Sequence, residues 1–153
     1  VPVIAHAVHW QNTHASAATE VCCIYATAPF LRAEDLQQGL QTLRKTDASY
    51  AFSVTKYVFP IQRAIRITAE QRVEMFNPVH AVTRSQDLEE AWHDAGQFYW
   101  GRAERWLAQD DLFGPRSAPI PLPPYRVQDI DTPDDWDRAE WMFHAMNRDR
   151  AEA

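Results

Sequence analysis

Near its carboxyl end the chain reads Arg126-Val127-Gln128-Asp129-Ile130-Asp131-Thr132-Pro133-Asp134-Asp135-Trp136. Asp129 and Asp131 stand two residues apart, directly before a helix-start signal with Thr132 as the expected N-cap and Pro133 as the first helical residue. On an extended strand end, residues i and i+2 point to the same side, so both carboxylates can face one site. The stretch therefore predicts an acidic pair between the end of a sheet strand and the last helix.

Two interpretations of this acidic pair remain open from spacing alone. Two hard oxygen ligands on one side suit Mg²⁺, which takes one or two protein carboxylates and completes its octahedron with water and substrate phosphates. Mn²⁺ accepts the same ligands. Alternatively, Asp129 and Asp131 are solvated turn acids that only help to start the helix.

The composition indicates one globular domain spanning residues 1–153. With 46% hydrophobic and 24% charged residues, the chain has the material for a core and is not of the disordered class. A net charge of −6 argues against nucleic-acid or anionic-membrane partners, which need basic patches. No apolar run approaches the roughly 20 residues of a membrane span, and no secretory signal is visible.

The chain has two cysteines, Cys22 and Cys23, which are adjacent within an apolar run. Neighbours on a strand point to opposite faces, so a disulfide between them would be strained. We therefore expect reduced core residues of a cytoplasmic protein.

The first half of the chain has the rhythm of an α/β fold. Residues 21–25 form a continuous apolar run that predicts a buried, parallel strand. Residues 33–46 have leucines at helical spacing, and residues 48–55 alternate as a strand does. Strand, helix and strand in this order predict a βαβ unit.

Residues 60–82 depart from this rhythm. They contain two short alternating segments around a polar turn, which predicts a β-hairpin insertion outside the main sheet. Its apolar side chains need a partner, and a second copy of the chain is the expected one, so we expect a homodimer. Residues 119–124 are rich in proline and cannot form an interior strand, because proline donates no ladder hydrogen bond.

Three segments, in this order and spacing, resemble the cytidylyltransferases that activate nine-carbon acidic sugars, the acylneuraminate (sialic acid) family with its pseudaminic acid branch. They are Tyr25-Ala26-Thr27-Ala28-Pro29-Phe30-Leu31-Arg32, Arg84-Ser85-Gln86-Asp87-Leu88-Glu89-Glu90-Ala91-Trp92-His93-Asp94-Ala95-Gly96-Gln97-Phe98-Tyr99-Trp100 and Gln128-Asp129-Ile130-Asp131-Thr132-Pro133. The resemblance covers about the carboxyl-terminal two thirds of such an enzyme.

This resemblance implies a Rossmann-like, mostly parallel nucleotidyltransferase fold of the nucleotide-diphospho-sugar transferase type. It also implies transfer of CMP from CTP to a nonulosonic acid, with release of pyrophosphate. The family begins with a strand and a Gly-rich phosphate loop, whereas the first of the four glycines here is Gly39. We therefore expect this chain to lack the first strand and the phosphate loop, and to be inactive alone.

The resemblance also assigns site residues. Asp129 and Asp131 would hold Mg²⁺ against the CTP phosphates. Thr27 and Pro29 fall where a loop borders nucleotide and sugar, and Tyr25 stands where sialic acid enzymes have Gln.

Four further positions are assigned to sugar binding. Gly96 matches the glycine of an Asn-Gly turn whose Asn is replaced here by Ala95, and Gln97 is expected to supply the amide contact. Arg84 lies near an arginine that binds the sugar carboxylate, and Arg63 is the other candidate. These departures favour pseudaminic acid over sialic acid, in a pathway of bacterial surface or flagellin glycosylation.

Two other functions remain open at this stage. One is a sugar-nucleotide glycosyltransferase with an Asp-x-Asp metal clamp. The other is a non-catalytic α/β module whose insertion mediates oligomerisation.

Overall fold

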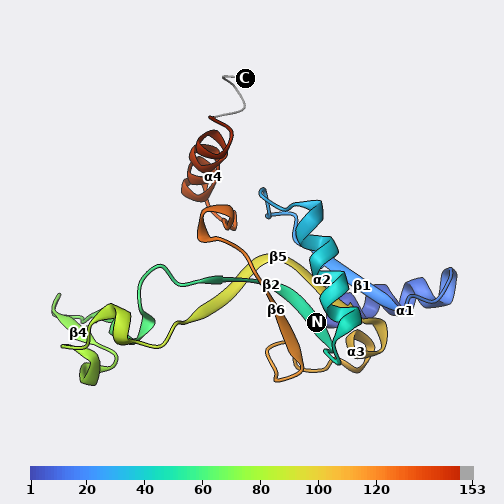
Figure 1. Ribbon diagram of the computed structural model, residues 1–153, viewed down its shortest axis with the longest axis horizontal. Helices are drawn as coiled ribbons and strands as arrows, with labels where there is room; N and C mark the ends of the chain where they lie inside the picture. Colours follow the sequence, from blue (N-terminus) through green and yellow to red (C-terminus); the bar gives the residue numbers. More distant parts are fainter. Residues whose placement is uncertain (149–153) are drawn as a thin grey trace.

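The computed structural model of the chain describes residues 1–148. Its elements form a four-stranded sheet in the order β1-β5-β2-β6 and a separate two-stranded sheet of β3 and β4 (Figure 1). The helices are α1 (Pro2–His14), α2 (Ala33–Lys45), α3 (Ala103–Ala108) and α4 (Pro133–Met146). The strands are β1 (Glu20–Ile24), β2 (Tyr50–Lys56), β3 (Ile65–Ile67), β4 (Val73–Met75), β5 (Trp92–Arg102) and β6 (Ser117–Pro121). Short 3₁₀ helices are η1 (Ile61–Arg63), η2 (Pro78–His80), η3 (Ser85–Asp87) and η4 (Pro124–Arg126).

The main sheet is mixed, and three of its four strands point the same way. β2 pairs with β6 in parallel, while β5 lies between β1 and β2 and is antiparallel to both. The expected α/β class with a mostly parallel core is therefore confirmed. The pairing expected for residues 21–25 was wrong: β1 is a half-buried strand whose neighbour in the described chain is the antiparallel β5. The βαβ unit is split because β5 inserts between its two strands.

Helices cover both faces of the sheet. The alternation of β2 sends its large side chains to the face covered by α1 and α3, where the core consists of Val8, Tyr50, Phe52, Val54, Tyr99, Ala103 and Trp106. On the opposite face, Leu43 of α2 packs with Ala51, Phe98 and Ile120 of the strands. This two-sided burial is the physical reason for the apolar character of the central strands.

The proline-rich segment forms an edge strand. β6 is the last strand of the sheet and pairs on one side with β2. Its free side needs no ladder donors, so Pro119 and Pro121 are tolerated there. The expectation that this segment is not an interior strand is confirmed.

The hairpin lies outside the main sheet and forms one end of the molecule (Figure 1). Ile65 pairs with Met75 and Ile67 with Val73, so these four side chains share one face. The expected hairpin is confirmed.

The last helix begins as its sequence predicts. The Thr132 hydroxyl accepts from Asp135 N–H, and the Asp135 carboxylate accepts from Thr132 N–H, which is a complete capping box. The Thr132 hydroxyl holds the pKa of Asp135 below its usual range. α4 projects from the sheet in Figure 1. Within residues 1–148, no helix combines the length and apolarity needed to cross a membrane.

A buried ion pair ties the start of α2 to the segment before α4. Arg126 Nη1 donates to Asp35 Oδ2 at 2.8 Å, and Nη2 donates to Asp35 Oδ1 at 3.1 Å. Both side chains are about nine-tenths buried. The hydrogen bond to Asp35 raises the pKa of Arg126. Because a buried charge without its partner is costly, the two residues depend on each other.

We predict that Arg126→Ala lowers the free energy of unfolding by about 3–5 kcal/mol, since it leaves Asp35 buried and unpaired. An apolar double replacement, Asp35→Leu with Arg126→Met, should lose much less, because it leaves no buried charge. Glu74→Ala, which breaks the exposed Arg66–Glu74 pair, is the control and should cost less than about 1 kcal/mol. Urea unfolding measures all three, and equal losses for Arg126→Ala and Glu74→Ala would contradict the prediction.

Candidate functional site

The site is organised by a bend in β5. The ladder to β2 pairs Phe52 with Tyr99 and Val54 with Asp94, so the four intervening residues of β5 face Ser53 alone. At the bend, Gly96 has a φ of +61°, a conformation that other L residues rarely adopt. The buried Ser53 hydroxyl accepts from Gln97 N–H and Phe98 N–H, both at 3.3 Å. The bend is thus a β-bulge whose lost ladder bonds are replaced by a side chain.

Asp94 closes the other side of the bend. Its Oδ1 accepts from Gly96 N–H at 2.8 Å, and its Oδ2 accepts from the Tyr99 hydroxyl. Burial and this contact with Asp94 raise the pKa of Tyr99. The ring of Tyr25, which follows β1, lies 5.1 Å from the Tyr99 ring, and Tyr25 N–H donates to Gln97 O at 3.0 Å. The end of β1 is therefore joined to the bend.

Asp129 lies against this bend. A Cβ built on Gly96 would stand 3.5 Å from Asp129 Oδ2 and 3.7 Å from its Cγ. The expected placement of the acidic pair at a strand end was wrong: β6 ends at Pro121, η4 follows, and residues 127–131 belong to no ladder. The physical reason is the proline-rich run before them, which turns the chain out of the sheet.

Asp131 stands directly before the cap of α4. Its backbone N–H donates to Asp135 Oδ2 at 3.3 Å. Gln128 Nε2 donates to Asp135 Oδ1 at 3.1 Å and to Asp129 O at 2.7 Å. The capping box and Gln128 together fix the backbone that carries both acids, while the Asp129 and Asp131 side chains remain exposed.

The donor set of this pair fits a hard divalent cation. Asp129 and Asp131 supply carboxylate oxygens, and neither forms an ion pair within residues 1–148. A Cβ on Gly96 would stand at an ordinary van der Waals distance from Asp129, so the positive φ, and not a lack of space, favours glycine here. The same residues contain no cluster of three or more acidic, His or Cys ligands, so a metal here would complete its shell with water or phosphate oxygens.

Gln97 has a supporting position. Its side chain is 1% exposed, and Nε2 donates to Arg126 O at 2.6 Å, while Oε1 has no partner within the described chain. The amide thus links the bend to Arg126, and through it to Asp35. Its role toward a sugar stays a prediction.

The remaining expected residues fall into two groups. Thr27 and Pro29 lie in the loop between β1 and α2, near the end of β1 that Tyr25 extends. Arg63 ends η1 and Arg84 precedes η3, and both are exposed members of the segment that carries the hairpin. Within a single chain, Tyr25, Gly96, Gln97 and Asp129 meet at one bend, whereas Arg63 lies in the insertion and Arg84 lies between the insertion and β5.

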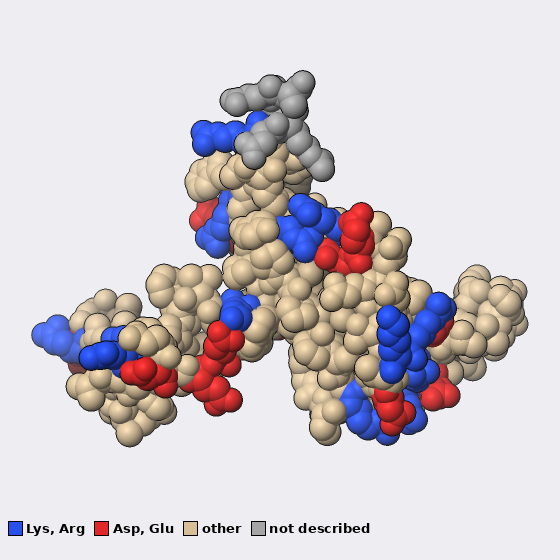
Figure 2. Space-filling model, viewed as in Figure 1, with Lys and Arg blue, Asp and Glu red and all other residues tan. Residues whose placement is uncertain are grey.

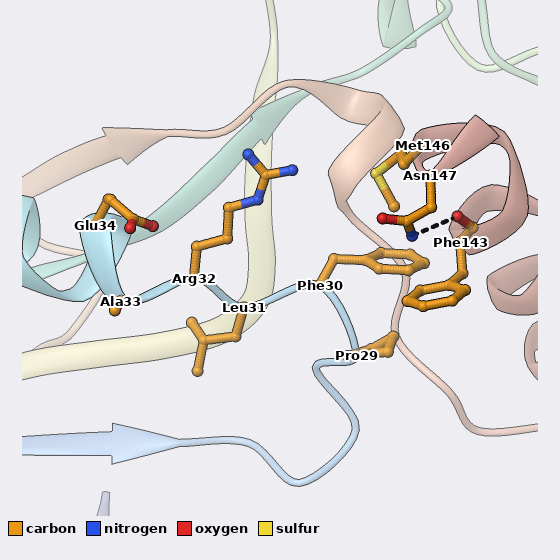
Figure 3. A pocket seen from close by; sticks show the side chains of 9 residues that line it. All are labelled: Pro29, Phe30, Leu31, Arg32, Ala33, Glu34, Phe143, Met146 and Asn147. Carbon is orange, nitrogen blue, oxygen red and sulfur yellow. Dashed lines mark hydrogen bonds between the residues drawn. The ribbon is translucent and has the colours of Figure 1, made fainter. Parts of the chain in front are cut away.

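A groove runs between the loop after β1 and α4. One part, of about 550 Å³, is lined by Pro29, Phe30 and Arg32 from the loop and by Phe143, Met146 and Asn147 from the helix (Figure 3). A neighbouring part of about 340 Å³ adds Ile130 and Trp136. The groove therefore joins the Thr27–Pro29 loop to the segment that carries Asp129 and Asp131.

Sequence reasoning missed three residues of this arrangement. Asp35 lies within the expected helix of residues 33–46, and nothing local connects it to Arg126. Ser53 lies within the expected strand of residues 48–55, and nothing local indicates that its hydroxyl binds β5. Asp94 had a usable signal, because Asp followed two residues later by Gly is typical of a turn in which the carboxylate accepts the backbone N–H.

Comparison with known proteins bears on the fold and on the sequence separately. No family model matches the chain. Its fold is similar to that of a solved CMP:2-keto-3-deoxy-manno-octonic acid synthetase complexed with CTP. The TM-score is 0.61 with 11% identity, over 94% of this chain and 68% of that one. The fold is thus that of the nucleotidyltransferases.

In sequence, the chain is similar to pseudaminic acid cytidylyltransferases. It is 37% identical over 141 residues to that of Campylobacter jejuni serotype O:2, covering 92% of this chain and 61% of the relative. It is 41% identical over 123 residues to that of serotype O:23/36, covering 80% and 53%. A Helicobacter pylori protein named as this cytidylyltransferase and a UDP-sugar hydrolase is 30% identical over 125 residues, covering 81% of this chain and 24% of that one. The chain spans between half and two thirds of the two Campylobacter relatives, and the resemblance drawn from three motifs is confirmed.

Proposed function

We propose that the protein containing this chain transfers CMP from CTP to a nine-carbon acidic sugar, with pseudaminic acid as the favoured acceptor, and releases pyrophosphate. The observation that carries the proposal is the placement of Asp129 against the Gly96 bend, on a nucleotidyltransferase fold. The identity of 37–41% to pseudaminic acid cytidylyltransferases supports the choice of nucleotide and sugar class.

The chemistry requires charge neutralisation and positioning. The anomeric hydroxyl oxygen of the sugar attacks the α-phosphorus of CTP, the bond from that phosphorus to the bridging oxygen breaks, and pyrophosphate leaves while the hydroxyl loses its proton. Asp129 and Asp131 would hold Mg²⁺, or Mn²⁺ in its place, and the cation supplies positive charge next to the phosphates. Catalysis then depends mainly on how accurately the chain orients the two reactants.

The sugar would lie between the bend and the loop after β1. Tyr25, Thr27, Pro29 and the Gly96 backbone border this space, and Arg63 and Arg84 are the candidates for the sugar carboxylate. Because both arginines are exposed in the stretch between β2 and β5 that carries the hairpin, we infer that they reach a sugar site only when this stretch packs against further protein.

The cellular setting is also a proposal. Cys22 and Cys23 are free thiols, and burial raises the pKa of Cys22 to about 12. Adjacent free cysteines suit a reducing compartment, and we place the reaction in the cytoplasm. The activated sugar would serve bacterial surface or flagellin glycosylation.

We predict that the full-length protein forms CMP-pseudaminic acid from CTP in the presence of Mg²⁺, and turns over N-acetylneuraminic acid much more slowly. A site built for a particular hydroxyl or amide rejects analogues lacking it by large factors, and Tyr25 and Ala95 replace two amides of the sialic acid enzymes. The assay offers each sugar separately and measures the CMP-sugar. Equal turnover of N-acetylneuraminic acid would remove the sugar preference, and failure with every nine-carbon acid would remove the function.

We predict that Asp129→Asn and Asp131→Asn each reduce turnover by on the order of 10²-fold or more in the full-length protein, because each removes a charge that faces cation and phosphates. Asp134→Asn, an exposed first-turn acid of α4, is the matched control and should keep nearly full activity. Full activity in both test variants would leave Asp129 and Asp131 as turn acids.

We further propose that the hairpin is a homodimer contact. An isolated two-stranded hairpin has little stability of its own, and here its apolar face is open to solvent. Ile67 and Val73 are each 70% exposed, and Ile65 is 54% exposed. Figure 2 shows uncharged surface between the charged side chains of this lobe. A second copy offering the same face would cover it, which is the commonest symmetric arrangement.

We predict that replacing Ile67 and Val73 by Asp converts a dimer into a monomer, or weakens the dimer strongly, because two charges would be buried at the contact. Val3→Asp is the control, since Val3 is 81% exposed at the start of α1 and far from the hairpin in sequence. Light scattering over a range of concentrations reports the mass. A wild-type protein that is monomeric at every concentration would contradict this prediction.

A further inference from the structure

At the bend, both carboxylate oxygens of Asp94 accept hydrogen bonds from other residues of β5. Oδ1 accepts from Gly96 N–H at 2.8 Å, and Oδ2 accepts from the Tyr99 hydroxyl. Its side chain is half-buried, and Phe98 and Tyr99 of the same strand are buried. Both oxygens of Asp94 thus serve as acceptors for donors of the bend itself.

The bend needs such an anchor. Between the pairs Val54–Asp94 and Phe52–Tyr99, the ladder offers Gly96 N–H no acceptor on β2. A glycine at positive φ has wide conformational freedom, so its backbone is defined by what it contacts. The Tyr99 hydroxyl holds Asp94, and Asp94 in turn holds Gly96.

The Asp129 side chain lies next to Gly96, whose N–H donates to Asp94. The Asp129 side chain is nearest to the open side of Gly96, with Oδ2 at 3.5 Å and Cγ at 3.7 Å from where a Cβ would stand. The backbone of Asp129 is held by Gln128, whose Nε2 donates to Asp129 O at 2.7 Å, and Asp129 Oδ1 accepts from Ile130 N–H at 3.1 Å. Asp129 Oδ2 is the atom that faces the Gly96 turn, so a shift of that turn would change the surroundings of this oxygen.

We propose that Asp94 is a positioning residue for Asp129, acting through the Gly96 turn, and that Tyr99 fixes Asp94 for this task. The inference rests on the proposed function, in which Asp129 is a cation ligand. Groups that orient metal ligands from behind change metal affinity by about 10–100-fold when they are removed. The geometry assigns Asp94 that effect without direct contact with the cation.

The test measures Mn²⁺ binding to the full-length protein with CTP present, from the loss of the free-Mn²⁺ electron paramagnetic resonance signal against a protein-free CTP blank. Asp94→Ala should raise the Mn²⁺ dissociation constant by about 10–100-fold. Asp94→Asn keeps an oxygen acceptor for Gly96 N–H and should stay within about threefold of the wild type. Asp111→Ala is the matched control, because Asp111 Oδ1 accepts from Phe113 N–H at 3.1 Å in a turn away from the bend, and it should bind as the wild type does.

The outcomes separate the inference from the proposed function. Wild-type Mn²⁺ affinity in Asp94→Ala, together with lost affinity in Asp129→Asn, would overturn the positioning role and leave the function standing. Wild-type affinity in Asp129→Asn would overturn the metal site itself. A loss in Asp94→Asn as large as in Asp94→Ala would also overturn the proposal, because charge rather than the hydrogen bond would then be responsible. If Asp94→Ala does not fold, Tyr99→Phe decides, with an expected loss of about threefold or more and with unchanged binding as the contrary result.

Discussion

The buried contact between Asp35 and Arg126 joins parts of the chain that are 91 residues apart, and the rest of the site is built on it. Asp35 comes from the first turn of α2, and Arg126 ends the 3₁₀ helix that leads toward α4. The Arg126 carbonyl accepts from Gln97, so the same residue also grips the bend of β5. Arg126 thus connects α2 through its side chain and β5 through its backbone carbonyl, directly before the loop of the acidic pair.

The candidate site forms at an irregularity of the sheet, the bend in β5. The bulge leaves backbone N–H groups of β5 without ladder partners on the β2 backbone, and the side chains of Ser53 and Asp94 satisfy them. Bulges that redirect side chains are common next to active sites. This one interrupts β5, a strand whose residues are mostly buried or half-buried. The stability of the strand and the geometry of the candidate site therefore rest on the same few hydrogen bonds.

The molecule also contains surface that its own core does not cover. The main sheet is packed on both faces by α1, α2 and α3, whereas one face of the β3–β4 hairpin remains apolar and open. The arginines proposed for the sugar carboxylate, Arg63 and Arg84, flank this hairpin in the sequence. A partner that covers the hairpin would therefore also lie next to the stretch of chain that carries the arginines proposed for the sugar site.

Local patterns in the sequence determined a large part of this protein. Helical spacing defined α2, alternation defined β2, the Thr132–Asp135 box defined the start of α4, and prolines placed β6 at an edge, because each feature depends on residues a few positions apart. Three motifs in order also pointed to the nucleotidyltransferase fold. Tertiary structure alone decided that β5 splits the βαβ unit, that Asp35 meets Arg126, and that Asp129 lies against Gly96 rather than at a strand end. Those contacts join distant segments, and their partners are selected by packing and by the need to satisfy buried charges and backbone groups, neither of which any local pattern records.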